Sequence, residues 1–168
     1  MRATAVVLAT LLAAPVAGAA TKPEIARDAA PPQADGKLHT LRTIPEACAT
    51  LTGEFTGDAA KPYALGARRT SASCNPRARL VDAAKAGASA KSGWILNDRI
   101  RVPSAVCPSR QAVVQVWRRP GEAALPATDG QGQARIYLRE GLAQARAGEL
   151  ASLPVYAVQL AVEGKSCK

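Results

Sequence analysis

The chain has 168 residues, of which 48% are apolar and 4% aromatic, and 22 Lys and Arg against 13 Asp and Glu give a net charge of +9. This length and apolar content indicate one folded domain and exclude a chain that is disordered throughout. Aromatic residues are few, so the core must be built mainly from Val, Leu, Ile and Ala. The basic balance favours an acidic partner. A GC-rich genome, which the abundance of alanine suggests, gives the charge a second explanation in mutational bias.

Residues 1–20 have the pattern of a secretory signal peptide. An apolar run follows Arg2 and ends at Pro15, and small residues lead up to Ala19 and Ala20. The run is shorter than the ~20 strongly apolar residues that a spanning helix needs. We therefore expect cleavage near Ala19 or Ala20, a periplasmic or secreted protein, and no transmembrane span after cleavage.

The next segment, residues 21–37, predicts a disordered N-terminal arm. It mixes charged residues, alanines and the pair Pro31-Pro32 without a hydrophobic period. The remaining residues, 38–168, are expected to form a single compact domain.

The first expected element of this domain is a short N-terminal helix in TIPEACATLTG, residues 43–53. Thr43 and Glu46 match the S/T-x-x-E capping box, Pro45 falls in the first turn, and Gly53 can close the last one.

Alternation of apolar and polar residues then predicts strands. The segments are 62–70, 77–81, 93–96, 99–103, 111–119, 134–140 and 155–164. Asn97-Asp98 suits a tight hairpin between the third and fourth of these segments. A possible second helix near 142–152 would cross between the last two. The fold class is therefore α+β, mainly an antiparallel β-sheet with one short N-terminal helix.

Four cysteines lie far apart in the exported part of the chain: Cys48, Cys74, Cys107 and Cys167. An even count in an oxidising compartment predicts two disulfides. A zinc site needs paired Cys-x-x-Cys or Cys/His clusters, and a catalytic thiol needs a base. The single histidine, His39, lies next to the arm, so neither alternative is favoured.

The direction of the strands ranks the three possible pairings. The strand from Gln111 leads away from Cys107, and the last strand leads toward Cys167. If these two strands are antiparallel neighbours, the two sulfurs meet at one end of the sheet. We therefore expect Cys107 to pair with Cys167, and Cys48 to pair with Cys74.

Arginines recur with a spacing of two on three of the strands, which places each pair on one face. The candidate binding residues are Arg77, Arg79, Arg99, Arg101, Arg135, Tyr137 and Arg139. They predict an arginine-lined outer face if the strands share a sheet. The alternative is an ordinary solvated face, because long arginine stems cover apolar surface well.

Motifs for nucleotide, metal, calcium or serine-hydrolase chemistry are missing from the sequence, and we expect no cofactor and no metal. The carboxylates of Asp82, Asp98 and Glu140 lie on or beside predicted strands, and each is also explained as a turn cap or an arginine partner. Trp94 and Trp117 are expected as core anchors.

We therefore predict an exported, non-catalytic binding or inhibitor-like protein of the bacterial envelope. Its partner would be an anionic envelope component or an acidic protein, since nucleic acid is not expected in this compartment. The alternatives are a small envelope hydrolase that uses carboxylates, and an accessory subunit of an envelope complex held by sheet-edge pairing.

Overall fold

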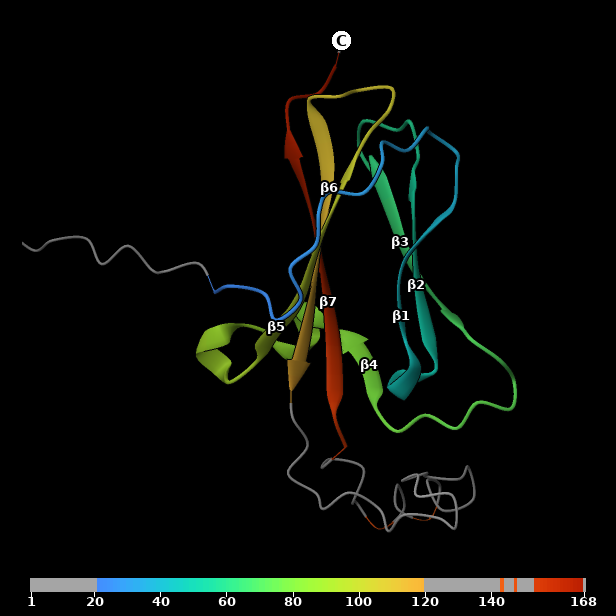
Figure 1. Ribbon diagram of the computed structural model, residues 1–168, viewed down its shortest axis with the longest axis vertical. Coiled ribbons are helices and arrows are strands. Elements are labelled where there is room, and N and C mark those ends of the chain that lie inside the picture. The colour runs from blue at the N-terminus through green and yellow to red at the C-terminus, as the bar shows by residue number, and fades with distance from the viewer. Residues whose placement is uncertain (1–20, 120–142, 144–146, 148–152, 168) are drawn as a thin grey trace, which may run out of the picture.

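The computed structural model describes residues 21–119, 143, 147 and 153–167 (Figure 1). Within these residues the chain forms mainly strands. The elements are β1 (His39–Ile44), η1 (Pro45–Ala47), β2 (Ala49–Phe55), β3 (Tyr63–Arg69), β4 (Arg79–Asp82), α1 (Ala83–Ala86), η2 (Ala90–Ser92), β5 (Ile95–Pro103), β6 (Arg110–Arg119) and β7 (Val155–Gly164). The strand expected at 134–140 and the helix expected near 142–152 lie outside the continuously described residues.

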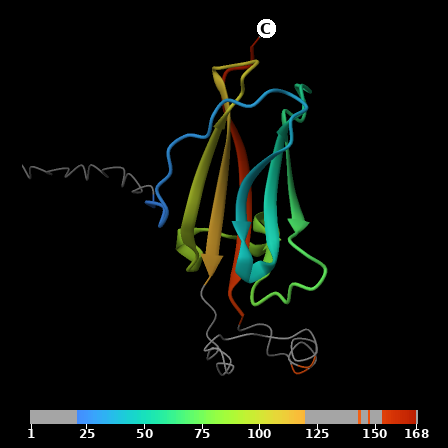
Figure 2. The same ribbon diagram turned by 45° about the vertical axis from the view of Figure 1, so that its right-hand side comes forward.

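The strands form two sheets that lie face to face (Figures 1 and 2). One sheet has the order β1-β2-β3 and is antiparallel. The other has the order β4-β7-β6-β5, in which β4 is parallel to β7 and the other pairs are antiparallel. The fold is therefore mainly β, as the alternating segments predict, with the layers arranged as in a sandwich.

The core between the sheets is built from the inward-facing residues of the strands, which alternate most regularly along β5 and β6. Its buried members are Leu41, Ile44, Leu51, Phe55, Tyr63, Ala78, Ile100, Val102, Ala112, Val114, Val116 and Tyr156. Phe55 and Tyr63 meet edge to face, with ring centroids 4.9 Å apart. Most of the other members are aliphatic, as the composition predicts.

The prediction of an N-terminal helix over 43–53 is wrong. Only Pro45–Ala47 forms a turn of 3-10 helix, and Ile44 at its N-cap makes no side-chain capping bond. Cys48 ends the turn in the left-handed region, with φ 50, and Ile44 pairs with Ala49 directly after it. The segment is therefore the tight connection of a β-hairpin.

Burial explains why this segment extends instead of coiling. Along β2 the apolar residues Leu51 and Phe55 are 1% and 2% exposed and belong to the core. The capping-box signal is local and weak, whereas burying such side chains contributes about 1.5–3 kcal/mol each. The α-helix of this part of the fold is α1, which Asp82 caps by accepting a hydrogen bond from the Ala84 N–H at 3.0 Å.

The expected hairpin at Asn97-Asp98 is also wrong, because β5 runs through both residues. The pairing of β5 with β6 shifts register between Leu96 and Asp98, which marks a bulge in a continuous strand. Asn and Asp suit a bulge as well as a turn, so the dipeptide alone does not distinguish the two.

The N-terminal segment lies along the outer edge of β5, where we expected an arm without fixed partners (Figure 1). Glu24 and Ile25 donate backbone hydrogen bonds to the carbonyls of Leu96 and Asn97, both at 2.9 Å. Farther along, Ala30 donates to Arg101 at 2.8 Å. These bonds satisfy backbone groups of an edge strand, which composition does not reveal.

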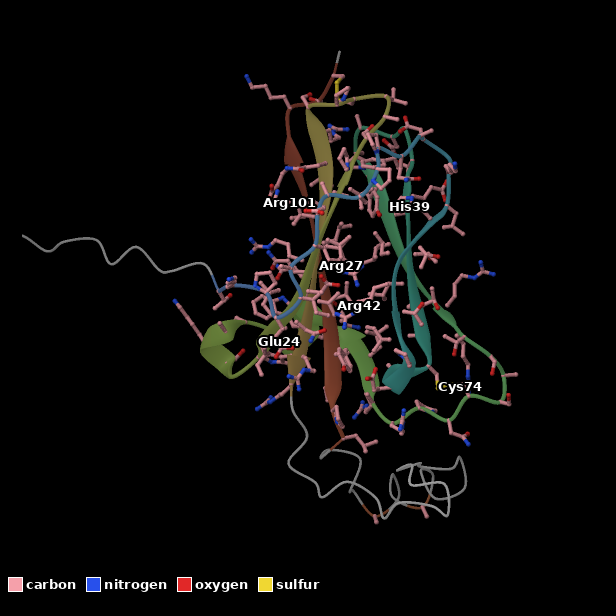
Figure 3. The ribbon with its side chains drawn as sticks, viewed as in Figure 1. Glu24, Arg27, His39, Arg42, Cys74 and Arg101 are labelled. Atoms are coloured by element: carbon pink, nitrogen blue, oxygen red, sulfur yellow. A yellow bond between two sulfur atoms is a disulfide. The ribbon has the colours of Figure 1, made fainter. Side chains whose placement is uncertain are left out.

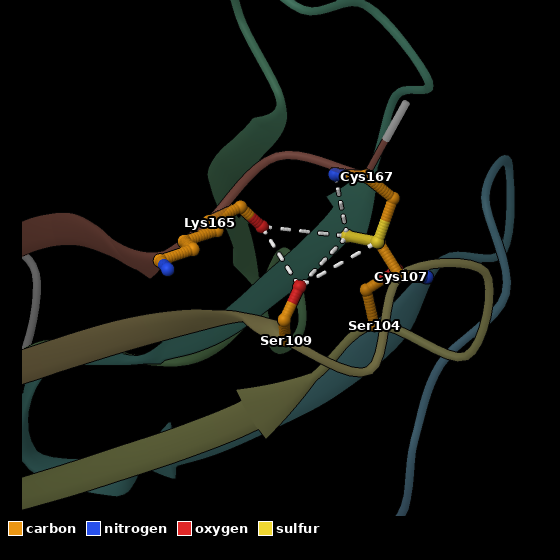
Figure 4. The surroundings of a disulfide bond; sticks show 5 residues. All are labelled: Ser104, Cys107, Ser109, Lys165 and Cys167. Atoms are coloured by element: carbon orange, nitrogen blue, oxygen red, sulfur yellow. Dashed lines mark hydrogen bonds between the residues drawn. A yellow bond between two sulfur atoms is a disulfide. The ribbon is translucent and has the colours of Figure 1, made fainter.

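Both disulfides have the predicted partners. The Cα atoms of Cys48 and Cys74 are 5.9 Å apart, and those of Cys107 and Cys167 are 5.5 Å apart. The second bridge joins the loop before β6 to the chain after β7 (Figure 4). There the Ser109 hydroxyl donates to the Lys165 carbonyl at 3.0 Å. Such bridges are consistent with an oxidising compartment outside the cytoplasm.

Among the described residues, no helix has the length and apolar content needed to cross a membrane.

Removing the Cys107–Cys167 bridge should destabilise the fold strongly. The bridge spans 60 residues, and in the chain-entropy model a loop of that length contributes about 4 kcal/mol. The double variant Cys107→Ser with Cys167→Ser should lose this amount of unfolding free energy in urea denaturation. A variant that unfolds at the wild-type midpoint would contradict the role assigned to the bridge.

Candidate functional site

Arg99 and Arg101 project together from the outer face of the four-stranded sheet. The residues between and beyond them, Ile100 and Val102, are 4% and 0% exposed and pack toward the other sheet. Because side chains alternate along a strand, Arg99 and Arg101 must point the opposite way. Both are half-buried. This is the face that the spacing of two predicts for them.

The register gives this arginine pair a row of polar neighbours. Arg99 lies opposite Gln115, which in turn lies opposite Gln159. Arg101 reaches across β6, and its Nη1 forms an ion pair with Glu163 Oε2 at 2.8 Å. The stem of Arg101 therefore crosses β6 near Val113, which is only 2% exposed although it lies on the outer face.

Arg99 differs from Arg101 in its partners. The Nε atom of Arg99 is buried and has no hydrogen-bond partner within the described part of the chain. Arg101 has Glu163, whose side chain is 47% exposed, so this pair is open to solvent and to competition.

A second cluster covers the rest of the outer face. Its buried members are Ala83, Trp94, Leu96, Trp117 and Ala157, supplied by α1, β5, β6, β7 and the residue before β5. Both tryptophans are buried, as core anchors should be. This cluster limits the arginine surface to the part of the sheet beyond it.

The other candidate arginines do not join Arg99 and Arg101. Arg79 is the first residue of β4 and lies level with Arg119 of β6, since both pair with Val155 of β7. Arg99 lies level with Gln115, which is four residues away from Arg119 along β6. Arg77 lies in the loop before β4, where its N–H donates to the Glu46 carbonyl. Arg135, Tyr137 and Arg139 lie outside the described residues.

A buried ionic cluster lies between the sheets; the sequence analysis considers an arginine partner for Asp98 but identifies neither the burial of Asp98 nor its partners. Asp98 is fully buried, and its Oδ2 is 2.9 Å from Arg27 Nε of the N-terminal segment and 3.6 Å from Arg42 Nη1 of β1. Figure 3 shows Arg27 and Arg42 converging beside β5. Asp98 thus links both sheets and the N-terminal segment through one carboxylate.

Glu24 makes a second link between the N-terminal segment and the sheet. Its Oε1 accepts from Arg118 Nη2 at 2.8 Å, and its Oε2 accepts from Asn97 Nδ2. The bulge at Leu96 and Asp98 allows this arrangement, because it turns Asn97 toward Glu24 while Asp98 faces inward.

The pKa values of Asp98 and Glu24 are shifted in opposite directions. Burial raises the pKa of Asp98, and the charges of Arg27 and Arg42 oppose that rise. The hydrogen bond from Arg118 lowers the pKa of Glu24, with burial acting against it. Asp98 therefore depends on its two cations to remain ionised inside the protein.

One signal for this cluster was present in the sequence. Asp98 shares the inward parity of Ile100 and Val102, so an acidic residue stands at a position reserved for the core. A buried carboxylate requires a cation, and arginines outside β5 were the candidates. No comparable signal in the sequence predicts that the N-terminal segment pairs with the edge of β5.

The carboxylates named for hydrolysis are engaged elsewhere. Asp82 caps α1, Asp98 is inaccessible to a substrate, and Glu140 lies outside the described residues. His39 shares a hydrogen bond with the Tyr63 hydroxyl at 2.8 Å. No group of three or more His, Cys, Asp or Glu side chains able to hold a metal occurs in residues 21–119 and 153–167.

Comparisons with family models, with curated proteins and with solved structures found no match.

Replacing Arg27 by Gln should destabilise the protein in a pH-dependent way. At neutral pH the loss of one cation beside an ionised, buried Asp98 should cost about 1–2 kcal/mol of unfolding free energy, allowing for the partial exposure of Arg27. Because its folded pKa is raised above the ordinary 3.8, Asp98 favours folding in acid, and this contribution is lost as the pH rises. Arg27 limits that loss.

The difference between variant and wild type should therefore shrink as the pH falls through the raised pKa of Asp98, since a protonated carboxyl needs no cation. Urea denaturation over a pH series measures it. Lys37→Gln removes an exposed charge from the same segment and should change stability little at any pH. A constant difference for Arg27→Gln would contradict this account of Asp98.

Proposed function

We propose that the protein is an exported, non-catalytic binding protein of the bacterial envelope, whose outer sheet face around Arg99 and Arg101 meets an anionic partner. The observation that carries this proposal is the placement of both arginines on one face, beyond the cluster that covers the rest of it. The partner is an anionic envelope component, with an acidic protein as the alternative.

The chemistry of the face supports an anion. Arginine guanidinium groups present planar sets of donors that match carboxylate and phosphate oxygens. The Nε of Arg99 lacks a partner among the described residues, and Gln115 and Gln159 add amide donors in the same row. The full chain has a net charge of +9, and the exported form keeps an excess of positive charge after loss of Arg2, which would steer an anionic ligand toward the protein at low salt.

Glu163 has a defined role in this proposal. It neutralises Arg101 through an exposed ion pair, and Gln111 Nε2 also contacts its Oε2 at 3.4 Å. An anionic ligand would replace Glu163 as the partner of Arg101. Glu163 therefore sets a lower limit on how strongly a ligand must bind to engage both arginines.

Two observations support the non-catalytic and extracytoplasmic parts of the proposal. The candidate carboxylates Asp82 and Asp98 already cap a helix and fill a buried ionic cluster. The two disulfides suit an oxidising compartment. The hydrolase alternative has no comparable support among the described residues.

Replacing both Arg99 and Arg101 by Gln should weaken binding to an anionic ligand. Each exposed charge contact contributes up to about 1 kcal/mol, and 1.4 kcal/mol is tenfold in affinity, so we expect a loss of about tenfold at low salt. Titration of poly-glutamate and of lipopolysaccharide, followed by fluorescence, measures the loss and distinguishes the two partner classes. The wild-type affinity should fall steeply as salt rises.

Two further variants sharpen this test. Lys61→Gln with Arg68→Gln removes two exposed positive charges, one from the loop before β3 and one from β3 itself. This variant should leave the affinity nearly unchanged. Glu163→Gln frees Arg101 and should raise the affinity. If the Arg99/Arg101 variant and the Lys61/Arg68 variant lose the same affinity, binding depends on net charge alone. That result would contradict a specific binding face around Arg99 and Arg101.

A further inference from the structure

The second half of β7 has a strand on only one side. β4 pairs with Val155–Val158 and then ends at Asp82, where α1 begins. β6 pairs with the whole of β7, up to Gly164. Residues 159–164 therefore form an open sheet edge within the described part of the chain.

Two hydrogen bonds show which backbone groups point out of this edge. The backbone carbonyl of Arg110 accepts a hydrogen bond from the N–H of Ser104, on the β5 side of β6. The backbone N–H and C=O groups of Gln111, and of every second residue after it, therefore point toward β7. Gln111 is opposite Glu163, which places the groups of Glu163, Ala161 and Gln159 toward β6. The N–H and C=O groups of Leu160 and Val162 must then point outward.

The contact at the other end of β7 agrees with this parity. The carbonyl of Pro154 accepts from the N–H of Arg79 in β4 at 2.9 Å, so the even-numbered residues face the β4 side. Beyond Val158, β4 no longer supplies partners for them. Backbone groups left open in this way are a template for another strand.

This edge lacks the usual protection. The segment 159–164 contains no Lys, Arg or Pro, its one charged residue, Glu163, is paired with Arg101, and it pairs with β6 without a register shift. Val162 is an exposed large apolar residue. By contrast, the N-terminal segment covers the edge of β5, and β3 carries the exposed Arg68 and Arg69.

We propose that a second copy of this chain pairs here, β7 to β7 and antiparallel, with the twofold axis at Ala161. In this register Leu160 lies opposite Val162 of the other copy, so the outward backbone groups of both copies bond to each other. The side chains match as well, because Leu160 faces Val162 and Gln159 faces Glu163. No positive side chain of β7 opposes the pairing, despite the net charge of +9.

Such a dimer joins two four-stranded sheets into one sheet of eight strands. The twofold axis is perpendicular to the sheet, so the Arg99/Arg101 pairs of both copies lie on the same side. Five strand spacings separate them, or about 24 Å. The pairing itself does not depend on what the arginine face binds, and either inference can fail alone.

Sedimentation equilibrium of the oxidised, signal-cleaved protein tests the proposal. We expect a reversible dimer at concentrations up to about 1 mM, since a short edge is a small interface. Val162→Pro removes an outward N–H without touching the bonds to β6, and it should make the protein monomeric. Val162→Lys should do the same by charging the edge, in case the proline prevents folding.

Two alanine positions supply the controls and the register. Ala64→Lys adds the same charge to an exposed position of β3 and should leave the dimer intact. Ala161→Cys should form a disulfide-linked dimer under mild oxidation, because a non-hydrogen-bonded pair brings its Cα atoms within bridging distance, whereas Ala64→Cys should not.

A wild-type protein that stays monomeric up to about 1 mM would overturn the proposal, and would leave the edge to the strand of a different protein. A dimer that survives both Val162 variants would also overturn it.

Discussion

The ionised carboxylate of Asp98 is the constraint on which the arrangement of this protein depends. Moving a carboxylate out of water costs several kcal/mol unless cations accompany it. Arg42 supplies one cation from the three-stranded sheet, and Arg27 supplies the other from the N-terminal segment. If either the three-stranded sheet or the N-terminal segment is out of place, Asp98 loses a cation and the fold loses stability. The two sheets and the segment are therefore stable only when all three are in place. The apolar core allows many alignments of two flat layers, and this cluster favours one of them.

The sequence predicts the features that depend on local alternation and fails where partners come from far along the chain. β6 and β7 follow from their alternating residues, and their antiparallel pairing places Cys107 beside Cys167 as expected. The capping-box pattern at Thr43 is equally local, but the core takes the residues after it into β2. The N-terminal segment has a composition typical of disorder, and only the open edge of β5 explains its hydrogen bonds.

The candidate binding face shows the same limit. Spacing correctly places Arg99 and Arg101 on one side of a strand, since parity is local. Spacing does not say which strands are neighbours, so Arg79 was grouped with residues at a different edge and end of the sheet. Nor does it say that Trp94 and Trp117 belong to a buried cluster on that face. The extent of a surface is a tertiary property, although the direction of each side chain is not.

The four-stranded sheet treats its β5 edge and the half of β7 beyond the end of β4 in opposite ways. At β5 the N-terminal segment occupies the edge and is fixed there by Glu24 and Arg27. At β7 the edge beyond Val158 is open. A sheet with two open edges adds strands without limit, whereas a sheet with one open edge is complete once two copies pair. The ionic cluster that aligns the sheets thus also holds the N-terminal segment on the β5 edge, so a second copy cannot add its strand there.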